Sequence, residues 1–203
     1  FNTSAIYAAG TAGSGNNADA AAVVNINGDV DLAVDGSGVI ANMDGATVNI
    51  NGGGIIKINE APADFDGGAV HYALAAMSGT INMNVTNDTE KMVVLYGNVG
   101  VLDRAANSAE SCKHSEVNLQ LNTADSLWKG VAVEAISEMN SADGYTGAIN
   151  LGLSNGASWY NQVYGNVYDE YEGSRVASFA GGSDKDHAGN IFQNDSGDLT
   201  IGS

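Results

Sequence analysis

The sequence predicts an all-β chain in which the coils of a parallel solenoid, with about three strands per coil, stack on one another. Three observations support this prediction. A short segment of alternating apolar residues and Asn recurs along the chain, other strand-like runs lie between its copies, and turn-forming residues are abundant. The 203 residues include 27 Gly, 23 Asn and a single Pro, which favours many tight turns between short strands over long helices.

The clearest repeat is the pentapeptide VNING at residues 24–28, which returns unchanged at residues 48–52. Degenerate copies begin at Ile81, Val117 and Ile149. Their period of two predicts strands with apolar residues on one face and Asn on the other. A unit of this kind covers its apolar face by stacking on its neighbours, which is typical of a solenoid.

Further strands are expected between these copies. They lie at residues 30–34 and 38–43 after the first copy and at 54–58 and 69–76 after the second. Another run, residues 91–102, follows the third copy and is interrupted at Gly97. Each coil would therefore contain about three short strands.

Stacking at the usual interstrand spacing of about 4.8 Å would align equivalent residues from coil to coil. The outward Asn residues would form a ladder in which each amide can donate to the next. A β-sandwich with a few similar strands is the alternative, but the identical pentapeptide favours the coil. The two expected inward columns are Val24, Val48, Ile81, Val117 and Ile149, and Ile26, Ile50, Met83, Leu119 and Leu151; the outward column is Asn25, Asn49, Asn82, Asn118 and Asn150.

We expect residues 1–203 to form a single solenoid segment of a longer protein. The more regular coils are expected at residues 5–60 and loop-bearing coils at 61–147. A third section, residues 148–203, differs from both in its sequence motifs. Extruded loops are expected at residues 59–68, 103–115 and 138–147. The second loop is rich in Ala and Ser, so it could hold a helical turn or be a solvated loop.

The charge of the chain limits its partners. Lys and Arg number 7 against 24 Asp and Glu, for a net charge of −17, which argues against binding to nucleic acid or to anionic lipid. No apolar run is long enough to span a membrane, so direct membrane insertion of this segment is not expected. Cys112 is the only cysteine, so no disulfide can form within the chain.

The C-terminal section carries a family resemblance. It contains Ala157-Ser158-Trp159 after a strand and small-residue turn, GNIFQNDS at residues 189–196, and Leu199-Thr200-Ile201. These motifs resemble those in the passenger domains of autotransporter adhesins, which Gram-negative bacteria export by type V secretion. The resemblance implies a right-handed parallel β-helix displayed outside the cell, on the outer membrane surface. The scarcity of Cys suits that export route.

Catalytic motifs are sparse, and we expect no enzyme activity, no cofactor and no metal site. The three histidines, His71, His114 and His187, are scattered and have no metal-ligand spacing. A polysaccharide-degrading enzyme is the alternative, because Asp64 with Asp66, and Asp184 with Asp186 next to His187, could act as carboxylate pairs about 7 Å apart if they alternate along strands. The interpretation without catalysis is that each pair lies in a polar turn.

One group of aromatic residues is a candidate ligand-binding surface. Aromatic faces next to amides and carboxylates can stack on sugar rings or serve as a protein hot spot. Four of them also have near-helical spacing, so the alternative is a stripe that packs a short helix or arm onto the coils. The candidates are Trp159, Tyr160, Tyr164, Tyr168 and Tyr171.

The function expected from these features is adhesion. A surface-exposed adhesin segment would attach the cell to a surface protein or glycan of a host or of other bacteria, or would self-associate in aggregates and biofilms. Many weak contacts on a stiff coil would add through multivalency. The remaining alternative is a passive spacer that lifts a distant tip away from the membrane.

Overall fold

The computed structural model describes residues 4–10, 22–43, 46–59, 70–86, 90–102, 114–136, 145–167, 171–194 and 197–202. Within these ranges the protein is all-β, and every regular element is a strand. The strands form three large sheets and one small sheet, and the strand pairs in all of them are parallel. The described residues contain no helix that is long and apolar enough to cross a membrane.

We number the large sheets in the order in which the chain enters them. The first sheet contains, in spatial order, β1 (Ser4–Ala9), β4 (Ser37–Asn42), β7 (Tyr72–Met77), β10 (Asn98–Leu102) and β13 (Ala132–Ala135). The second contains β2 (Val23–Ile26), β5 (Thr47–Ile50), β8 (Thr80–Met83), β11 (His114–Leu121), β14 (Thr146–Leu153) and β17 (Ser178–Ala180). The third contains β3 (Val30–Val34), β6 (Gly54–Ile58), β9 (Val93–Tyr96), β12 (Leu127–Gly130), β15 (Ser158–Asn161) and β18 (Asn190–Gln193). The small sheet pairs β16 (Gly173–Val176) with β19 (Asp198–Ile201).

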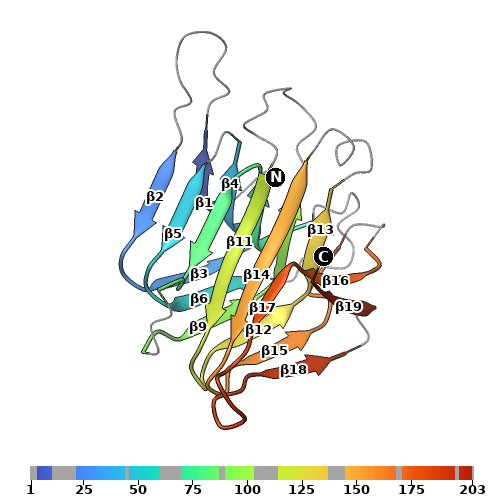
Figure 1. The fold of residues 1–203 in the computed structure, drawn as a ribbon. Coiled ribbons are helices and arrows are strands. Elements are labelled where there is room, and N and C mark those ends of the chain that lie inside the picture. The colour runs from blue at the N-terminus through green and yellow to red at the C-terminus, as the bar shows by residue number, and fades with distance from the viewer. Residues whose placement is uncertain are drawn as a thin grey trace.

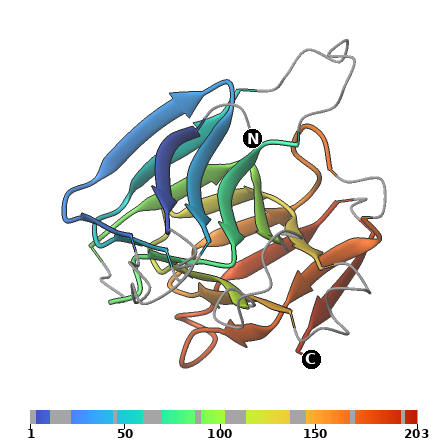
Figure 2. The ribbon, with the colours of Figure 1, turned by 90° about the horizontal axis from the view of Figure 1, so that it is seen from above.

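Neighbouring strands within each large sheet are three apart along the chain, so the chain visits the three sheets in turn. We call one such pass a rung. Figure 1 shows the second sheet with β2, β5, β11, β14 and β17 side by side. In Figure 2 the colours advance from blue to red across the molecule, which shows that the rungs follow one another in sequence order. This arrangement of stacked parallel sheets is consistent with the expected solenoid.

The predicted register of the repeats is confirmed. Val24 pairs with Val48, and the same column continues through Ile81, Val117 and Ile149. The last four of these side chains are buried, while Val24, in the first rung, is half-buried. The pentapeptide repeat therefore marks equivalent positions of successive rungs.

The predicted Asn ladder is also present, on the outer face of the second sheet. The Nδ2 of Asn49 donates to Asn25 Oδ1 at 2.8 Å, and Asn82 donates to Asn49 at the same distance. Asn118 and Asn150 continue the series, again at 2.8 Å. In the next rung, Ser178 Oγ donates to Asn150 Oδ1 at 2.6 Å. Every donor in the ladder therefore points toward the rung that precedes it in the chain.

Most predicted strand boundaries agree with the structure. The runs at residues 30–34 and 54–58 are β3 and β6, and the run at 91–102 divides into β9 and β10 at Gly97, whose φ is 148°. The predicted strands at 38–43 and 69–76 are shifted, to Ser37–Asn42 and Tyr72–Met77. Two predicted loops end too late, because β11 and β14 pair from their first residues, His114 and Thr146. The proposed helical turn lies outside the described residues.

The inner faces of the three sheets enclose one apolar core. In its C-terminal half, Trp128 and Trp159 stack with ring centroids 4.6 Å apart and planes 3° apart. Their indole N–H groups donate to the carbonyl oxygens of Gly97 and Gly130, at 3.0 and 2.9 Å. A Cβ at Gly130 would lie 2.1 Å from Gly97 O, so the close approach of the two rungs requires glycine there.

The first sheet is apolar on its outer face too, where a second cluster forms. Val167 and Tyr171, which come from the segment after β15, pack against this cluster. The three central strands of the first sheet, β4, β7 and β10, are therefore buried on both faces, as their nearly continuous apolar sequences require. The buried members of the second cluster are Ile40, Tyr72, Ala75, Met77, Leu102, Val131 and Val133.

Candidate functional site

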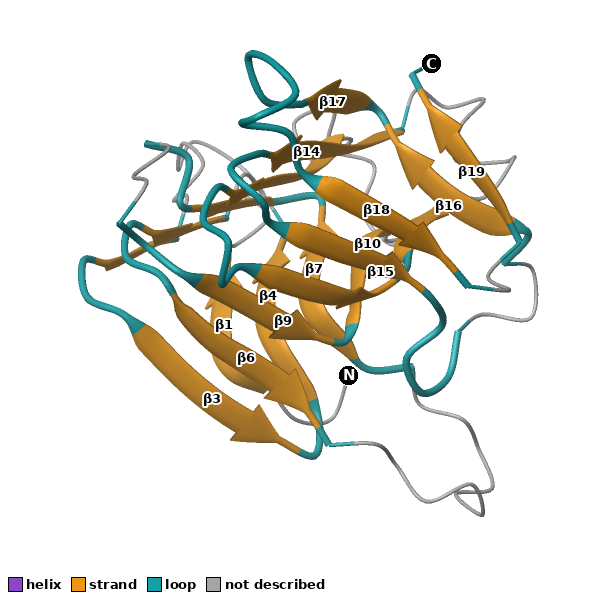
Figure 3. Cartoon of the chain, turned by 90° about the horizontal axis from the view of Figure 1, so that it is seen from below, coloured by secondary structure: helices purple, strands orange, loops and turns teal. Residues whose placement is uncertain are grey.

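The candidate site is the outer face of the third sheet, which Figure 3 shows from below with β3, β6, β9, β15 and β18 labelled. Alternation along each strand turns one set of side chains into the core and the other outward. In β6, for example, Ile56 and Ile58 are buried, whereas Lys57 is exposed. The parallel register then aligns the outward residues of successive strands in columns along the sheet.

One of these columns alternates lysines with aromatic residues. Lys57 pairs with Tyr96, Tyr96 with Lys129, and Lys129 with Tyr160, each one rung further along. Phe192 follows Tyr160 in the last strand of the sheet. We call these five residues the aromatic–lysine column. With strands about 4.8 Å apart, its members form a continuous line over five rungs.

An apolar column runs beside the aromatic–lysine column. Ile55, Val94 and Leu127 are register neighbours in β6, β9 and β12. They face outward two residues before Lys57, Tyr96 and Lys129. They are partly or largely covered, since Val94 is only 9 % exposed. The aliphatic stems of the lysines can lie along this surface while their ammonium groups remain in water.

The last two aromatic rings of the column stack on each other. Tyr160 and Phe192 have centroids 4.6 Å apart and ring planes 14° apart. In this arrangement the facing sides of the two rings cover each other, and the ring edges are left toward solvent. Aromatic edges carry partial positive charge, and the tyrosine hydroxyls are hydrogen-bond donors as well as acceptors.

The two lysines of the column differ from the other basic residues that the structure describes. Lys91 lies 3.3 Å from Asp29, Arg175 lies 3.7 Å from Glu134, and Lys185 lies 2.8 Å from Asp186. Lys57 and Lys129 form no ion pair with any described carboxylate. In a chain of net charge −17, two ammonium groups thus remain available on one face.

A polar corner borders this face, where the chain leaves the third sheet for the first. Asn98 is fully buried there, and its Nδ2 donates to the backbone oxygens of Tyr164 and Asn166, at 2.9 and 3.3 Å. Its Oδ1 accepts from the backbone N–H groups of Tyr164 and Val131, at 3.1 and 3.2 Å. Asn98 therefore ties the segment after β15 to two rungs.

The corner also positions an aromatic neighbour for the column. The Tyr164 ring is 8 % exposed and lies against Tyr96, with centroids 6.4 Å apart and planes tilted by 52°. This contact restricts the Tyr96 ring, which is half-buried. The middle of the aromatic–lysine column is thus held by the segment that Asn98 anchors.

The structure separates the predicted ligand residues instead of bringing them together. Trp159 is fully buried against Trp128, Tyr164 is buried at the corner, and Tyr171 packs on the second cluster. Burial raises the pKa of Tyr171, although its hydroxyl lies 3.1 Å from Ser174 Oγ, which opposes the shift. These three residues are therefore packed, at three separate places in the fold and not as one stripe. Only Tyr160 lies on the outer face, and Tyr168 lies outside the described residues.

Sequence reasoning missed the other members of the aromatic–lysine column. These members lie in strands whose sequences differ, so no repeated sequence motif links them. They are Lys57, Tyr96, Lys129 and Phe192. A signal was nevertheless present in the spacing. Lys57, Tyr96, Lys129 and Tyr160 each occupy an outward position in the strand that follows a copy of the Asn repeat. Aligning those strands rung by rung brings these four residues into one column, which Phe192 then extends.

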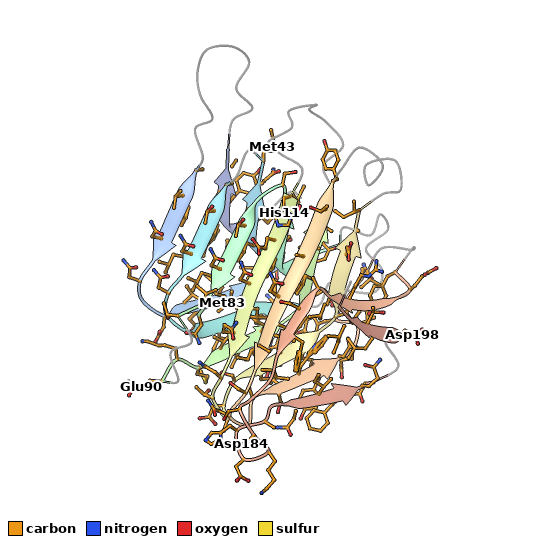
Figure 4. All side chains as sticks on the ribbon, in the orientation of Figure 1. Met43, Met83, Glu90, His114, Asp184 and Asp198 are labelled. Carbon is orange, nitrogen blue, oxygen red and sulfur yellow. The ribbon has the colours of Figure 1, made fainter. Side chains whose placement is uncertain are left out.

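One of the two carboxylate pairs considered for catalysis, Asp184 with Asp186, does not lie along a strand. Asp184 and Asp186 lie in a turn, labelled at Asp184 in Figure 4. Asp184 Oδ1 accepts from the backbone N–H of Asp186 at 2.9 Å and lies 2.8 Å from His187 Nδ1. The contact with His187, followed by the backbone bond, holds the pKa of Asp184 below its usual value.

Other candidates for catalysis and metal binding can be placed only in part. Asp64 and Asp66 lie outside the described residues. His114, at the start of β11 in Figure 4, has its Nδ1 2.8 Å from Thr146 Oγ1. The described residues include no group of three or more His, Cys, Asp or Glu side chains that could hold a metal ion.

Comparisons with known proteins add no assignment. The chain matches no protein-family model, no curated protein and no solved structure. The functional argument therefore depends on the geometry of the aromatic–lysine column and on the sequence itself.

Proposed function

We propose that this chain is a segment of a bacterial surface adhesin, folded as a right-handed parallel β-helix and displayed outside the cell on the outer membrane. The segment would attach the cell to a host or to neighbouring bacteria and contribute to aggregation or biofilm formation. The fold is supported by the three sheets of parallel strands, with three strands to a rung. The location is supported by the resemblance of residues 148–203 to autotransporter passenger domains.

The observation that carries the adhesive role is the aromatic–lysine column. Aromatic residues are enriched where proteins bind their partners, because they combine large contact area with few rotatable bonds. Here they occupy outward positions in three of the six strands of the third sheet, next to an apolar column. A structural rod that binds nothing would not need them on that face.

The stacked sheets determine how such a surface would bind. Outward residues are fixed on a paired backbone, so little conformational entropy is lost when a partner is bound. An extended partner can contact several rungs at once, and many copies on one cell add their contacts by raising the effective concentration. Modest affinity per segment is then enough for firm attachment.

A bead assay tests the adhesive role. Beads coated with the purified segment are mixed with bacterial and cultured epithelial cells, and the control beads carry an unrelated protein of similar size and net negative charge. Retention well above the control supports the proposal. Equal retention on both kinds of bead for every cell type would contradict it and would favour the spacer.

A further inference from the structure

We propose that the aromatic–lysine column is a binding site for a linear acidic polysaccharide, whose uronate carboxylates contact Lys57 and Lys129. This inference rests on the proposed adhesive function and names the class of ligand for it. The ligand lies along the column, with sugar units against Tyr96 and Tyr160 and carboxylates at the two ammonium groups.

Charge is the first argument for an anionic ligand. The structure pairs the other described basic residues with carboxylates, whereas Lys57 and Lys129 pair with none among the described residues. The outward residues of the six strands include one carboxylate, Asp31, which lies in the first rung. An otherwise strongly acidic chain therefore presents a local cationic strip, and such a strip favours an anion that is brought close to it.

Geometry is the second argument, because the column follows an unbroken register from β6 to β18. Lys57 and Lys129 are two rungs apart, about 10 Å at the usual interstrand spacing, with Tyr96 between them. A pyranose unit in an extended chain has a length comparable to one rung. Carboxylates on alternate sugars can then meet the two lysines, while the sugar between them lies beside Tyr96.

The stacking of the rings favours a glycan over a nucleic acid. Single-stranded nucleic acids bind by stacking their bases on aromatic faces, and the facing sides of Tyr160 and Phe192 cover each other. Hydroxyl groups, positive ring edges and ammonium groups suit the carboxylates and hydroxyls of an acidic sugar instead.

Binding of defined polymers to the purified segment tests the site. The probes are an oligogalacturonate, the same oligomer with its carboxyl groups methyl-esterified, and single-stranded oligothymidylate of similar length, each measured by calorimetry at low and high salt. We expect binding of the free acid, much weaker binding of the ester, and weakening with added salt. Equal binding of acid and ester, or tighter binding of the oligonucleotide, would overturn the proposal.

Two double variants locate the interaction. K57Q/K129Q removes the two ammonium groups of the column, and we expect an affinity for oligogalacturonate about tenfold lower. K91Q/K185Q removes two lysines that pair elsewhere and changes the net charge equally, so the affinity should stay within about twofold of the original. Equal losses in both variants would show a general charge effect and refute the site. Circular dichroism confirms that each variant is folded.

The same variants separate this inference from the adhesive function. If coated beads still retain cells with K57Q/K129Q as well as with the unmodified segment, adhesion stands but the column is not its polysaccharide site. If the unmodified segment retains no cells yet binds oligogalacturonate in a lysine-dependent way, the site stands and the adhesive function fails.

Discussion

At the scale of single residues, the buried polar side chains have a clear structural task. Asn98 uses both ends of its amide in a place that excludes water, and it joins the segment carrying Tyr164 to β10 and to the rung of Val131. Buried amides cost free energy unless they are bonded, so their partners define the local structure strictly. The corner beside the candidate site therefore depends on one side chain.

Replacing Asn98 with Ala should lower the free energy of unfolding by about 3 kcal/mol, because several buried backbone groups lose their partner. Asn166→Ala is the matched control. Asn166 takes part only through its backbone oxygen, so the control should change stability by less than about 0.5 kcal/mol. Urea denaturation measures both values. Similar losses in the two variants would contradict the role given to the Asn98 amide.

A second residue-scale prediction concerns the turn at Asp184. Its carboxyl pKa is lowered, first by the contact with His187 and then by the backbone bond from Asp186, so any stability it contributes is present above the unfolded pKa and lost as pH falls through the folded one. Replacing His187 with Ala should raise the Asp184 pKa toward its ordinary value. An NMR titration of the side-chain carboxyl measures the shift, and an unchanged pKa would refute the assignment.

At the scale of elements, the Asn ladder shows how a sequence repeat becomes a structural register. Each amide of the ladder from Asn49 to Asn150 both donates and accepts, and every bond between successive Asn residues is 2.8 Å long. A shift of one residue would turn the apolar columns outward and the amides inward. The ladder and the core therefore specify the same alignment of the second sheet.

Changing Asn82 to Asp tests the ladder at a central position. The carboxylate can still accept from Asn118 but cannot donate to Asn49 Oδ1, so we expect a loss of about 1–2 kcal/mol in the free energy of unfolding at neutral pH. Protonation restores the donor, so the loss should shrink near pH 3.

Asn25→Asp is the control for this prediction. Asn25 lies in the first rung, where its Oδ1 only accepts from Asn49, and a carboxylate preserves that bond. Thermal unfolding monitored by circular dichroism should therefore show little change for this variant. Equal destabilisation of both variants would mean that the direction of the hydrogen bonds is unimportant.

The sequence predicts the elements better than it predicts the site. The second sheet could be aligned in advance because its strands repeat the same alternation and share Asn at one position. The strands of the third sheet share no sequence motif, so only the strand register shows that Lys57, Tyr96 and Lys129 form a column. Trp159, Tyr160, Tyr164 and Tyr171 lie close together along the chain, but the fold distributes these four among the core, an outer face, a corner and the second cluster.

At the scale of the whole molecule, the rungs form a nearly one-dimensional array. Pairing within the large sheets links each rung to the rungs directly before and after it, as the strand order shows. In such arrays stability is close to a sum over units and their interfaces, so whole units can be removed. The fold should therefore tolerate a deletion that preserves register.

Deleting residues 48–80 tests this expectation, because Ile81 then follows Thr47 and takes the place of Val48, its register partner. We expect a soluble chain with the same type of circular dichroism spectrum and a shorter maximum dimension in small-angle X-ray scattering. Deleting residues 48–81 is the control. It shifts the register by one and should give an aggregated or unfolded product. Identical behaviour of both deletions would contradict the array.

The common direction of the donors in the Asn ladder gives the ladder a net dipole along the stack of rungs. From Ser178 back to Asn25 every side-chain bond points the same way, so the amide dipoles add along the axis and polarise one another. The two ends of the ladder consequently differ: the first presents the amide donor of Asn25, and the last presents the hydroxyl oxygen of Ser178, which can accept. Another stack of the same kind could prolong this line of dipoles only head to tail, since meeting head to head would oppose like poles.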